Sequence, residues 1–287
     1  MSNAIVGFPR WTGEATFTAG SAAAGYPAAN LGTLPLAYPW RSGGSTPLAA
    51  ASTAIAATFA TARKIGLVVV GPHNLSIGSS MRVRSFFDDA GTDMVTETTV
   101  ETWPAVFTED QVDWDGGRWW DRTYTQDEVS GYPWYRPILL PVEAYVRRVT
   151  VEIFDPLNPN GFVQAGLVEL ASVLRFPVNP EYGLQYGYRG RTETQEADGG
   201  TLYRRRRAKP RKVTGSVPYM PRDGAQGSFM EMQRQLDIDT PFFWWLDPDD
   251  ERGMVRNAWM AHFAELSLQA YATYDRDAVP VNIEEEL

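Results

Sequence analysis

Residues 145–154, with the sequence YVRRVTVEIF, decide how the rest of the chain is interpreted. Val149, Val151 and Ile153 fall on one side of an extended chain, while the positions between them are polar or charged. This two-residue period is typical of a strand with one buried face, and β-branched side chains favour the same conformation. The stretch therefore predicts a β-strand at the centre of the chain.

A second apolar run, FVQAGLVEL, follows at residues 162–170. Between the two runs lie Asp155-Pro156 and the sequence NPNG at 158–161. Proline fixes φ for a turn, and asparagine and glycine tolerate the positive φ of a tight reversal. The sequence therefore predicts a β-hairpin, with one β-domain before it and another after Pro177.

Composition supports a mainly β chain of two domains. A length of 287 residues is long for a single core, and 44% hydrophobic with 21% charged residues is ordinary for a globular protein. Ten Trp, 25 Gly and 20 Pro favour many short strands joined by turns. We place the domains at 1–177 and 178–287, with a Pro- and Gly-containing linker at 177–183.

Charge and residue usage exclude several classes of function. A net charge of −9 argues against general nucleic-acid binding, which needs a positive field. The absence of cysteine removes disulfides and thiolate zinc sites, and with only His73 and His262 a multi-histidine metal site is not expected. We expect no cofactor, no signal peptide and no membrane helix, since neither a signal-like start nor a long apolar run is present.

Three further strands are predicted in the first part, at 50–60, 64–71 and 80–87. The run 64–71 is apolar after Lys64 and ends at Gly71-Pro72, which is typical of a strand buried on both faces. Asp88 and Asp89 follow the third strand beside Gly91. They could contribute to a Ca²⁺ site, but the spacing lacks a full ligand set, and a solvated turn is favoured.

Aromatic residues are dense between 101 and 136. The tryptophans in this region are Trp103, Trp114, Trp119, Trp120 and Trp134. Indole faces stack on sugar rings, so the cluster could form a carbohydrate platform. The alternative is that these rings seal one end of a β-sandwich or lie in a subunit interface, where Trp and Tyr are enriched.

One strongly basic run contains Arg204, Arg205, Arg206 and Arg207 and continues to Lys212. It could be an exposed strand, or it could contact the acidic turn of another subunit. The acidic residues of that turn are Asp247, Asp249, Asp250 and Glu251. Nucleic acid is the least favoured partner, given the net charge of the chain.

The second part contains the one convincing helix. Ser228 and Glu231 have the spacing of a capping box, and Phe229, Met232 and Leu236 recur at helical intervals. Strands are predicted at 242–246, 254–263, 265–274 and 279–287. The simplest assembly is a helix that crosses a small antiparallel sandwich.

Several short segments of the first part resemble the discoidin-like (galactose-binding-like) jelly rolls of phage minor tail proteins. These segments are 30–31, 40–42, 65–69, 74–76, 81–84, 145–153 and 158–161. The second part, with its helix, aromatic strand, Asp247-Pro248 turn and acidic β finish, resembles the tube-type domain of siphophage distal tail proteins. The order of the two parts departs from the common arrangement, in which the ring-forming domain comes first.

The resemblance implies a structural subunit of a phage tail tip or baseplate. It implies a jelly-roll β-sandwich followed by a tail-tube-like sandwich with one flanking helix, and a hexameric ring that joins the tail tube to tip or hub proteins. Such a protein is assembled in the host cytoplasm and resides in the virion. The alternative function is a carbohydrate-binding adhesion module that contacts host surface glycans.

We do not expect an enzyme. A glycosidase requires two carboxylates at a defined separation, and nothing among the 35 acidic residues singles out a pair. His73 and His262 fall in different predicted domains, and Ser76 and Ser80 lack the context of a nucleophile elbow.

Overall fold

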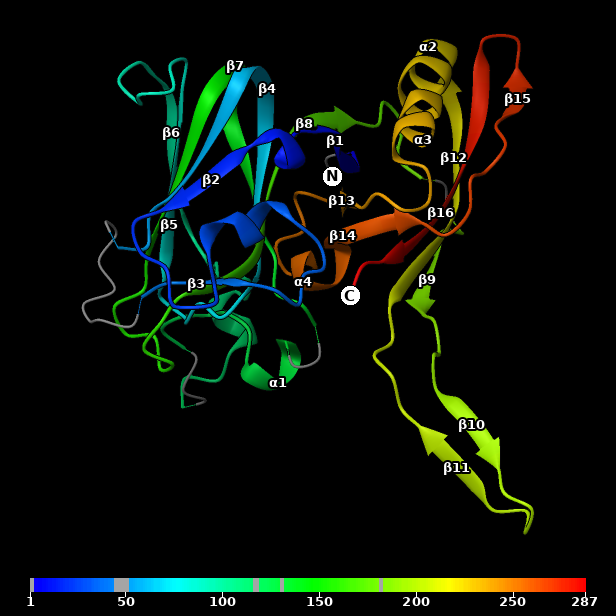
Figure 1. Cartoon of the computed structure of the whole chain (residues 1–287). Helices are drawn as coiled ribbons and strands as arrows, with labels where there is room; N and C mark the ends of the chain where they lie inside the picture. Colours follow the sequence, from blue (N-terminus) through cyan, green and yellow to red (C-terminus); the bar gives the residue numbers. More distant parts are fainter. Residues whose placement is uncertain (1–2, 44–51, 116–118, 130–131, 181–182) are drawn as a thin grey trace. The chain divides into compact units, whose positions relative to one another are not determined.

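The computed structural model describes residues 3–43, 52–115, 119–129, 132–180 and 183–287 (Figure 1). Strands hold 46% of the residues and helices 12%, so the prediction of a mainly β protein is confirmed. The chain forms two compact units. Unit 1 contains residues 7–174 and 247–258, and unit 2 contains residues 3–6, 175–246 and 259–287. The division into folding domains at 1–177 and 178–287 stays a prediction.

Unit 1 is built on two long antiparallel strands, β4 (Ile55–His73) and β7 (Arg136–Phe154). The strand order is β6-β5-β7-β4-β8, with β2 paired to β4 and β3 paired to β8. The other strands are β2 (Thr16–Ala19), β3 (Trp40–Arg41), β5 (Ser80–Phe86), β6 (Met94–Glu101) and β8 (Gln164–Arg175). The short helical turns are η1 (Thr12–Glu14), η2 (Ala28–Gly32), η3 (Glu109–Gln111), α1 (Gln126–Val129) and α4 (Met254–Asn257).

The two ends of β4 have different pairing partners. Residues 55–58 lie between β2 and residues 148–151 of β7, whereas residues 67–70 lie between residues 136–139 of β7 and residues 168–171 of β8. The pairing of β4 with β7 shifts register between Thr58 and Arg63, and this irregularity lets β4 bend between its two sets of partners. Buried side chains from β2, β4, β5, β7 and β8 join in one hydrophobic cluster. This is the arrangement of a β-sandwich whose layers share a core.

The predicted hairpin of 145–154 with 162–170 is wrong in its pairing. Residues 145–154 belong to β7 and residues 164–170 belong to β8, but β4 lies between the two strands and pairs with each. The connection at 155–163 is therefore a crossover, not a hairpin loop. Turn chemistry fixes a local reversal of the chain, but it does not choose the partner of each strand. Residues 55–58 and 63–64 of β4 pair with 145–151 of β7, and the buried residues 67–71 of β4 pair with 167–171 of β8.

The strands predicted at 50–60 and 64–71 form the single strand β4. Residues 50 and 51 lie outside the described part of the chain. The strand predicted at 80–87 is confirmed as β5, and Asp88 closes the turn after it. The Asp88 carboxylate accepts hydrogen bonds from the Thr92 hydroxyl and from the backbone N–H groups of Thr92 and Asp93. These bonds, the Thr92 hydroxyl first, lower the pKa of Asp88 to about 2, and they give this carboxylate a structural role in the turn.

The strands of unit 2 follow the order β13-β14-β16-β12-β9, and β15 pairs with β16 (Figure 1). Its strands are β9 (Gln185–Tyr188), β12 (Arg211–Pro221), β13 (Phe242–Trp245), β14 (Ala258–Phe263), β15 (Ala270–Thr273) and β16 (Arg276–Glu285). Ile5 and Val6 of β1 (Ile5–Arg10) pair with Trp245 and Trp244. A separate ribbon, β10 (Glu193–Glu196) with β11 (Leu202–Arg205), continues from β9 and β12.

The helix of unit 2 begins earlier than predicted. Residues 222–236 are helical, as α2 (Arg222–Gly224), a π-helical segment η4 (Ala225–Met230) and α3 (Glu231–Leu236). The expected apolar face is confirmed, because Phe229, Met232 and Leu236 are buried. The capping box is wrong. The N-cap is Pro221, and the Glu231 carboxylate accepts hydrogen bonds from Arg234 and Gln235, one turn further on.

The strand predicted at 242–246 is confirmed as β13. The segment 254–263 begins as the helical turn α4 and becomes a strand only at Ala258. The last two predicted strands exist as β15 and β16, although β15 is shorter than predicted.

A buried ion pair between β1 and β8 gives a test of the unit 1 core. The Arg10 Nε donates to both carboxylate oxygens of Glu169, at 2.8 and 2.9 Å, and the Glu169 side chain is fully buried. Burial raises the pKa of Glu169, and the Arg10 charge opposes that rise. We expect Arg10→Met to lower the free energy of unfolding by about 3–5 kcal/mol, because it leaves a buried carboxylate without its partner.

The matched control is the double variant Arg10→Met/Glu169→Leu, which removes both charges. Urea unfolding should show that the double variant is more stable than Arg10→Met alone. Equal midpoints for Arg10→Met and the unmodified protein would contradict this account.

Candidate ligand-binding pocket

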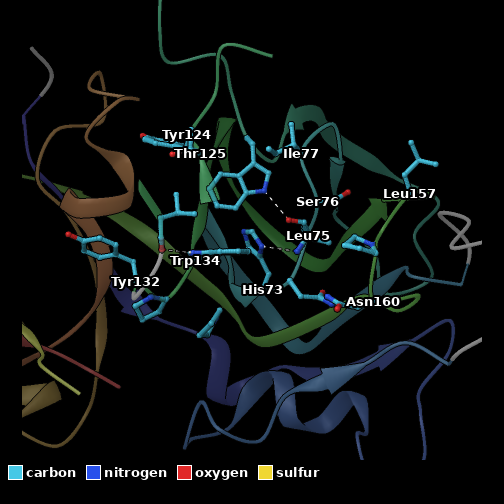
Figure 2. A pocket seen from close by; sticks show the side chains of 16 residues that line it. His73, Leu75, Ser76, Ile77, Tyr124, Thr125, Tyr132, Trp134, Leu157 and Asn160 are labelled. Atoms are coloured by element: carbon cyan, nitrogen blue, oxygen red, sulfur yellow. Dashed lines mark hydrogen bonds between the residues drawn. The ribbon is translucent and has the colours of Figure 1, made fainter. Parts of the chain in front are cut away.

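Unit 1 contains a cavity of about 720 Å³ where β4 ends (Figure 2). Four segments form its walls: the residues from the end of β4 to Ile77, the residue Trp103 after β6, the stretch around α1, and the crossover before β8. The lining residues are Pro72, His73, Asn74, Leu75, Ser76, Ile77, Trp103, Tyr124, Thr125, Val129, Tyr132, Pro133, Trp134, Leu157, Pro159 and Asn160.

Two indoles are held in fixed orientations in this pocket. The Trp103 Nε1–H donates to the Leu75 carbonyl and the Trp134 Nε1–H donates to the Val129 carbonyl, each at 3.0 Å (Figure 2). The two rings meet edge to face, with centroids 5.2 Å apart and planes at 84°. Since both polar N–H groups are used by the backbone, the rings present their apolar surfaces as binding surface.

Aromatic and aliphatic side chains support the indoles from behind. Tyr124 packs edge to face on Trp103, with ring centroids 6.2 Å apart. Tyr124, Val129 and Val255 form a small buried cluster. The Tyr124 hydroxyl donates to the carbonyls of Glu251 and Arg252, at 2.7 and 2.6 Å. The segment 247–258 is thereby attached to the wall of the pocket within unit 1.

Near the end of β4, a glycine lets the backbone of the pocket wall lie directly against the strand. A Cβ atom on Gly71 would lie 2.5 Å from the Trp134 carbonyl oxygen, closer than a carbon can come. The backbone N–H of His73 donates to the same carbonyl at 3.2 Å. Glycine at position 71 is therefore required for the backbone of Trp134 to lie against β4.

His73 is buried beneath the two indoles and is neutral. Burial, with a smaller contribution from the Arg136 charge, lowers the pKa of His73 to about 3. Its Nδ1 accepts a hydrogen bond from the Leu75 N–H at 3.3 Å, so the ring proton of the neutral imidazole is on Nε2. The imidazole ring packs edge to face against the indoles of Trp103 and Trp134, with ring centroids 5.7 and 6.3 Å apart, respectively.

The polar side chains of the pocket are mostly held in place by the fold. Asn74 donates to the Phe162 carbonyl and accepts from the Gln164 N–H. Ser76 donates its hydroxyl and its N–H to the buried carboxylate of Asp155. Asn160 differs, because its side chain is exposed and no hydrogen bond to it is found within the described chain. The Asn160 amide is therefore free to bind a ligand at the rim.

The five predicted tryptophans do not form one platform. Trp103 and Trp134 line the pocket, whereas Trp114 and Trp120 are 80% and 87% exposed and do not line it. Trp119 is half-buried and also lies outside the pocket lining. Sequence reasoning did not select His73 or Asn160 as site residues. The sequence indicates only their positions, because His73 follows the predicted strand at 64–71 and Asn160 lies within the predicted turn at 158–161.

The residues predicted to make subunit contacts belong to different units of the chain. Their pairing between two copies stays a prediction. Arg204 and Arg205 end β11 and Arg206 and Arg207 follow it, in unit 2, and Arg207 forms an ion pair with Glu193 at 2.6 Å. In unit 1, the Asp247 carboxylate accepts from the N–H of Asp249. The Asp250 carboxylate accepts from the N–H of Gly253, whereas the side chain of Glu251 is exposed.

Across the described residues, no group of three or more His, Asp or Glu side chains is placed to hold a metal ion. No helix in the same residues has the length and apolar character needed to span a bilayer.

No protein-family model matches the sequence, and no curated protein matches it. Similar solved structures include the family 32 carbohydrate-binding module of Clostridium perfringens NanJ in complex with galactose. It is 14% identical, covers 58% of this chain and 98% of its own, and has a TM-score of 0.37. The family 32 module of AlyQ, in complex with 4,5-unsaturated mannuronic acid, is 13% identical, covers 54% and 92%, and has a TM-score of 0.33.

A family 89 glycoside hydrolase from Clostridium perfringens is also similar, at 9% identity and a TM-score of 0.37. The match covers 60% of this chain but only 16% of the hydrolase. Nothing in these comparisons indicates a phage tail protein. With identities of 14% and below, none of these similarities assigns a function to this chain.

The buried neutral His73 predicts a defined pH dependence of stability. The unfolded chain binds a proton at this histidine below about pH 6.5, but the folded chain does not until about pH 3. His73 therefore contributes fully to stability above pH 6.5, and its contribution falls by about 1.4 kcal/mol per pH unit between those values. Urea unfolding at a series of pH values should show this slope in the free energy of unfolding. His73→Gln should remove the share of the slope that comes from His73.

His262→Gln is the matched control, because it removes the other histidine and leaves His73 in place. It should retain the slope of the unmodified protein. An unchanged slope in His73→Gln would show that His73 titrates normally in the folded state.

Proposed function

We propose that unit 1 is a carbohydrate-binding module and that the pocket at the end of β4 binds a sugar. The observation that carries this proposal is the pair of fixed indoles, Trp103 and Trp134, in a cavity of about 720 Å³. An indole offers a flat apolar surface on which the C–H face of a sugar ring can stack. A cavity of this size lies within the range of small-molecule sites.

The polar residues of the pocket suit recognition of sugar hydroxyls. Asn160 supplies an exposed amide at the rim, which can donate and accept at once. The Nε2–H of neutral His73 is a further polar group among the lining residues, whereas the Thr125 hydroxyl is already bonded to Glu128. Few polar groups beside an apolar surface give orientation without a large desolvation cost.

The pocket supports reversible binding more than catalysis. Its described lining consists of aromatic, aliphatic, amide and hydroxyl side chains together with neutral His73. Glycoside hydrolysis by general acid–base chemistry uses a pair of carboxylates on either side of the scissile bond.

Binding is tested by screening the purified chain on a glycan array and titrating a retained sugar by calorimetry. We expect Trp134→Ala to raise the Kd about tenfold or more, because it removes a stacking surface. Asn160→Ala should raise the Kd by up to about tenfold, through loss of a hydrogen bond to the sugar. Since Asn160 is exposed, this second variant should keep the fold even if Trp134→Ala does not.

Trp120→Ala is the matched control, because Trp120 is 87% exposed and lies outside the pocket lining. It should bind sugar like the unmodified protein. Loss of binding in Trp120→Ala with normal binding in Asn160→Ala would place the sugar on the exposed tryptophans and overturn the proposal.

A second candidate function is that of a structural subunit in a phage tail tip or baseplate, assembled in the host cytoplasm. Its partners would be further copies of the chain and tail-tube and hub proteins. The observation that favours an assembly subunit is the ribbon β10–β11, whose strand residues are all exposed. The two functions are compatible, because a sugar-binding module can contact the host surface from a tail tip.

A further inference from the structure

The segment 185–209, termed the arm, is an extended β-ribbon of unit 2 (Figure 1). It begins where β9 pairs with β12 and continues as β10 paired with β11. Every residue of the arm except Ala197 is exposed. Among them are large side chains with little cover, since Tyr186 is 80% exposed, Tyr203 64% and Leu202 51%.

An isolated two-stranded ribbon is only marginally stable in water, because it has no third strand or helix on which to bury a face. The arm nevertheless carries tyrosine and leucine on its strands. Exposed aromatic side chains with arginine are the residue types enriched at the centres of protein interfaces. The composition of the arm therefore favours a binding partner.

Charge identifies the chemistry of that partner. The arm contains seven arginines and lysines against three acidic residues, a net charge of +4. Since the whole chain carries −9, the remainder carries −13. Another copy of this chain is therefore an acidic partner for the arm, and attraction between the two will favour their encounter.

The arginines of the arm are only partly neutralised within the chain. A hollow of about 680 Å³ beside the arm is lined by Arg189, Arg191 and Arg207. Arg189 pairs with Glu284 at 2.9 Å, and Arg207 pairs with Glu193 at 2.6 Å. Arg191 has no ion pair with an acidic residue of the described chain, and the same holds for Arg204, Arg205 and Arg206. These four guanidinium groups are available to a partner.

Unit 1 presents an acidic surface of matching character. The segment 101–128 carries eight acidic and two basic residues, and its exposed carboxylates include Asp113, Asp115 and Asp121. Trp114 and Trp120, which the pocket does not use, are exposed beside them in the sequence. The acidic segment 247–251 adjoins this surface, because Tyr124 donates to the Glu251 carbonyl. We use the term acidic surface for residues 109–115, 119–121 and 247–251.

We propose that the arm of one copy binds the acidic surface of a second copy. The arginines of the arm pair with the carboxylates, and their guanidinium planes stack on Trp114 and Trp120. The contact joins two different surfaces, so it is heterologous and can continue from copy to copy into a ring or filament. This inference deepens the second candidate function and does not depend on sugar binding.

The first measurement is the mass of the full chain by light scattering at low and high salt. We expect oligomers at low ionic strength that dissociate at 1 M salt, where the Debye length falls to about 3 Å. A monomer at low salt across the accessible concentrations would overturn the proposal.

Two variants locate the contact. Arg204→Gln/Arg205→Gln/Arg206→Gln neutralises the arm, and Asp113→Asn/Asp115→Asn/Glu251→Gln neutralises the acidic surface. Each should be monomeric by itself, with self-association weakened on the order of a hundredfold. Because each variant keeps one intact surface, an equal mixture should form one-to-one dimers that grow no further. The charge-conserving control Arg204→Lys/Arg205→Lys/Arg206→Lys should still associate.

Each alternative gives a different result. Oligomers that persist in both variants would place the interface elsewhere, and a mixture that stays monomeric would exclude this pair of surfaces. Arm-dependent retention of an RNA or DNA oligonucleotide by a monomeric chain would assign the arm to nucleic acid. Sugar titration of the arm variant separates this inference from the proposed function, because the pocket is unchanged there.

Discussion

The structure of unit 1 depends on the backbone pairing of β4 along both of its edges. Residues 67–70 are hydrogen-bonded to β7 on one side and to β8 on the other, and their side chains are buried. Such a segment cannot shift without breaking two ladders and exposing apolar surface. Pro72 to Ser76 continue directly from this segment, so the most constrained part of the unit positions one wall of the pocket.

The same constraint explains which parts of the fold the sequence could predict. The apolar run at 64–71 indicates a strand buried on both faces, and residues 65–71 of β4 are buried in this way. The alternation at 149–153 likewise identifies β7. The pairing of 145–154 with 162–170 could not be predicted, because turn residues specify a local reversal and not the neighbour of each strand. The partner was decided by β4, which is distant in sequence.

The sequence predicted that the candidate site would be aromatic, but it did not predict which tryptophans line the pocket. Aromatic density between 101 and 136 indicates a surface for rings, yet only long-range contacts separate Trp103 and Trp134 from Trp114 and Trp120. The indole of Trp103 is fixed by the Leu75 carbonyl, 28 residues earlier. A pattern within the cluster carries no information about that bond. Similarly, the spacing of Ser228 and Glu231 fits a cap, but the helix extends to Arg222 and makes that cap unnecessary.

The most direct test of the central claim is to observe the tryptophan indole N–H groups by NMR during a sugar titration. The side-chain signals are assigned by single Trp substitutions, and galactose, glucose, mannose and N-acetylglucosamine are added in turn. If the pocket binds sugar, the signals of Trp103 and Trp134 shift with a shared saturation curve, and those of Trp114 and Trp120 do not. Shifts confined to Trp114 and Trp120, or no shift with any sugar that the chain retains, would contradict the account.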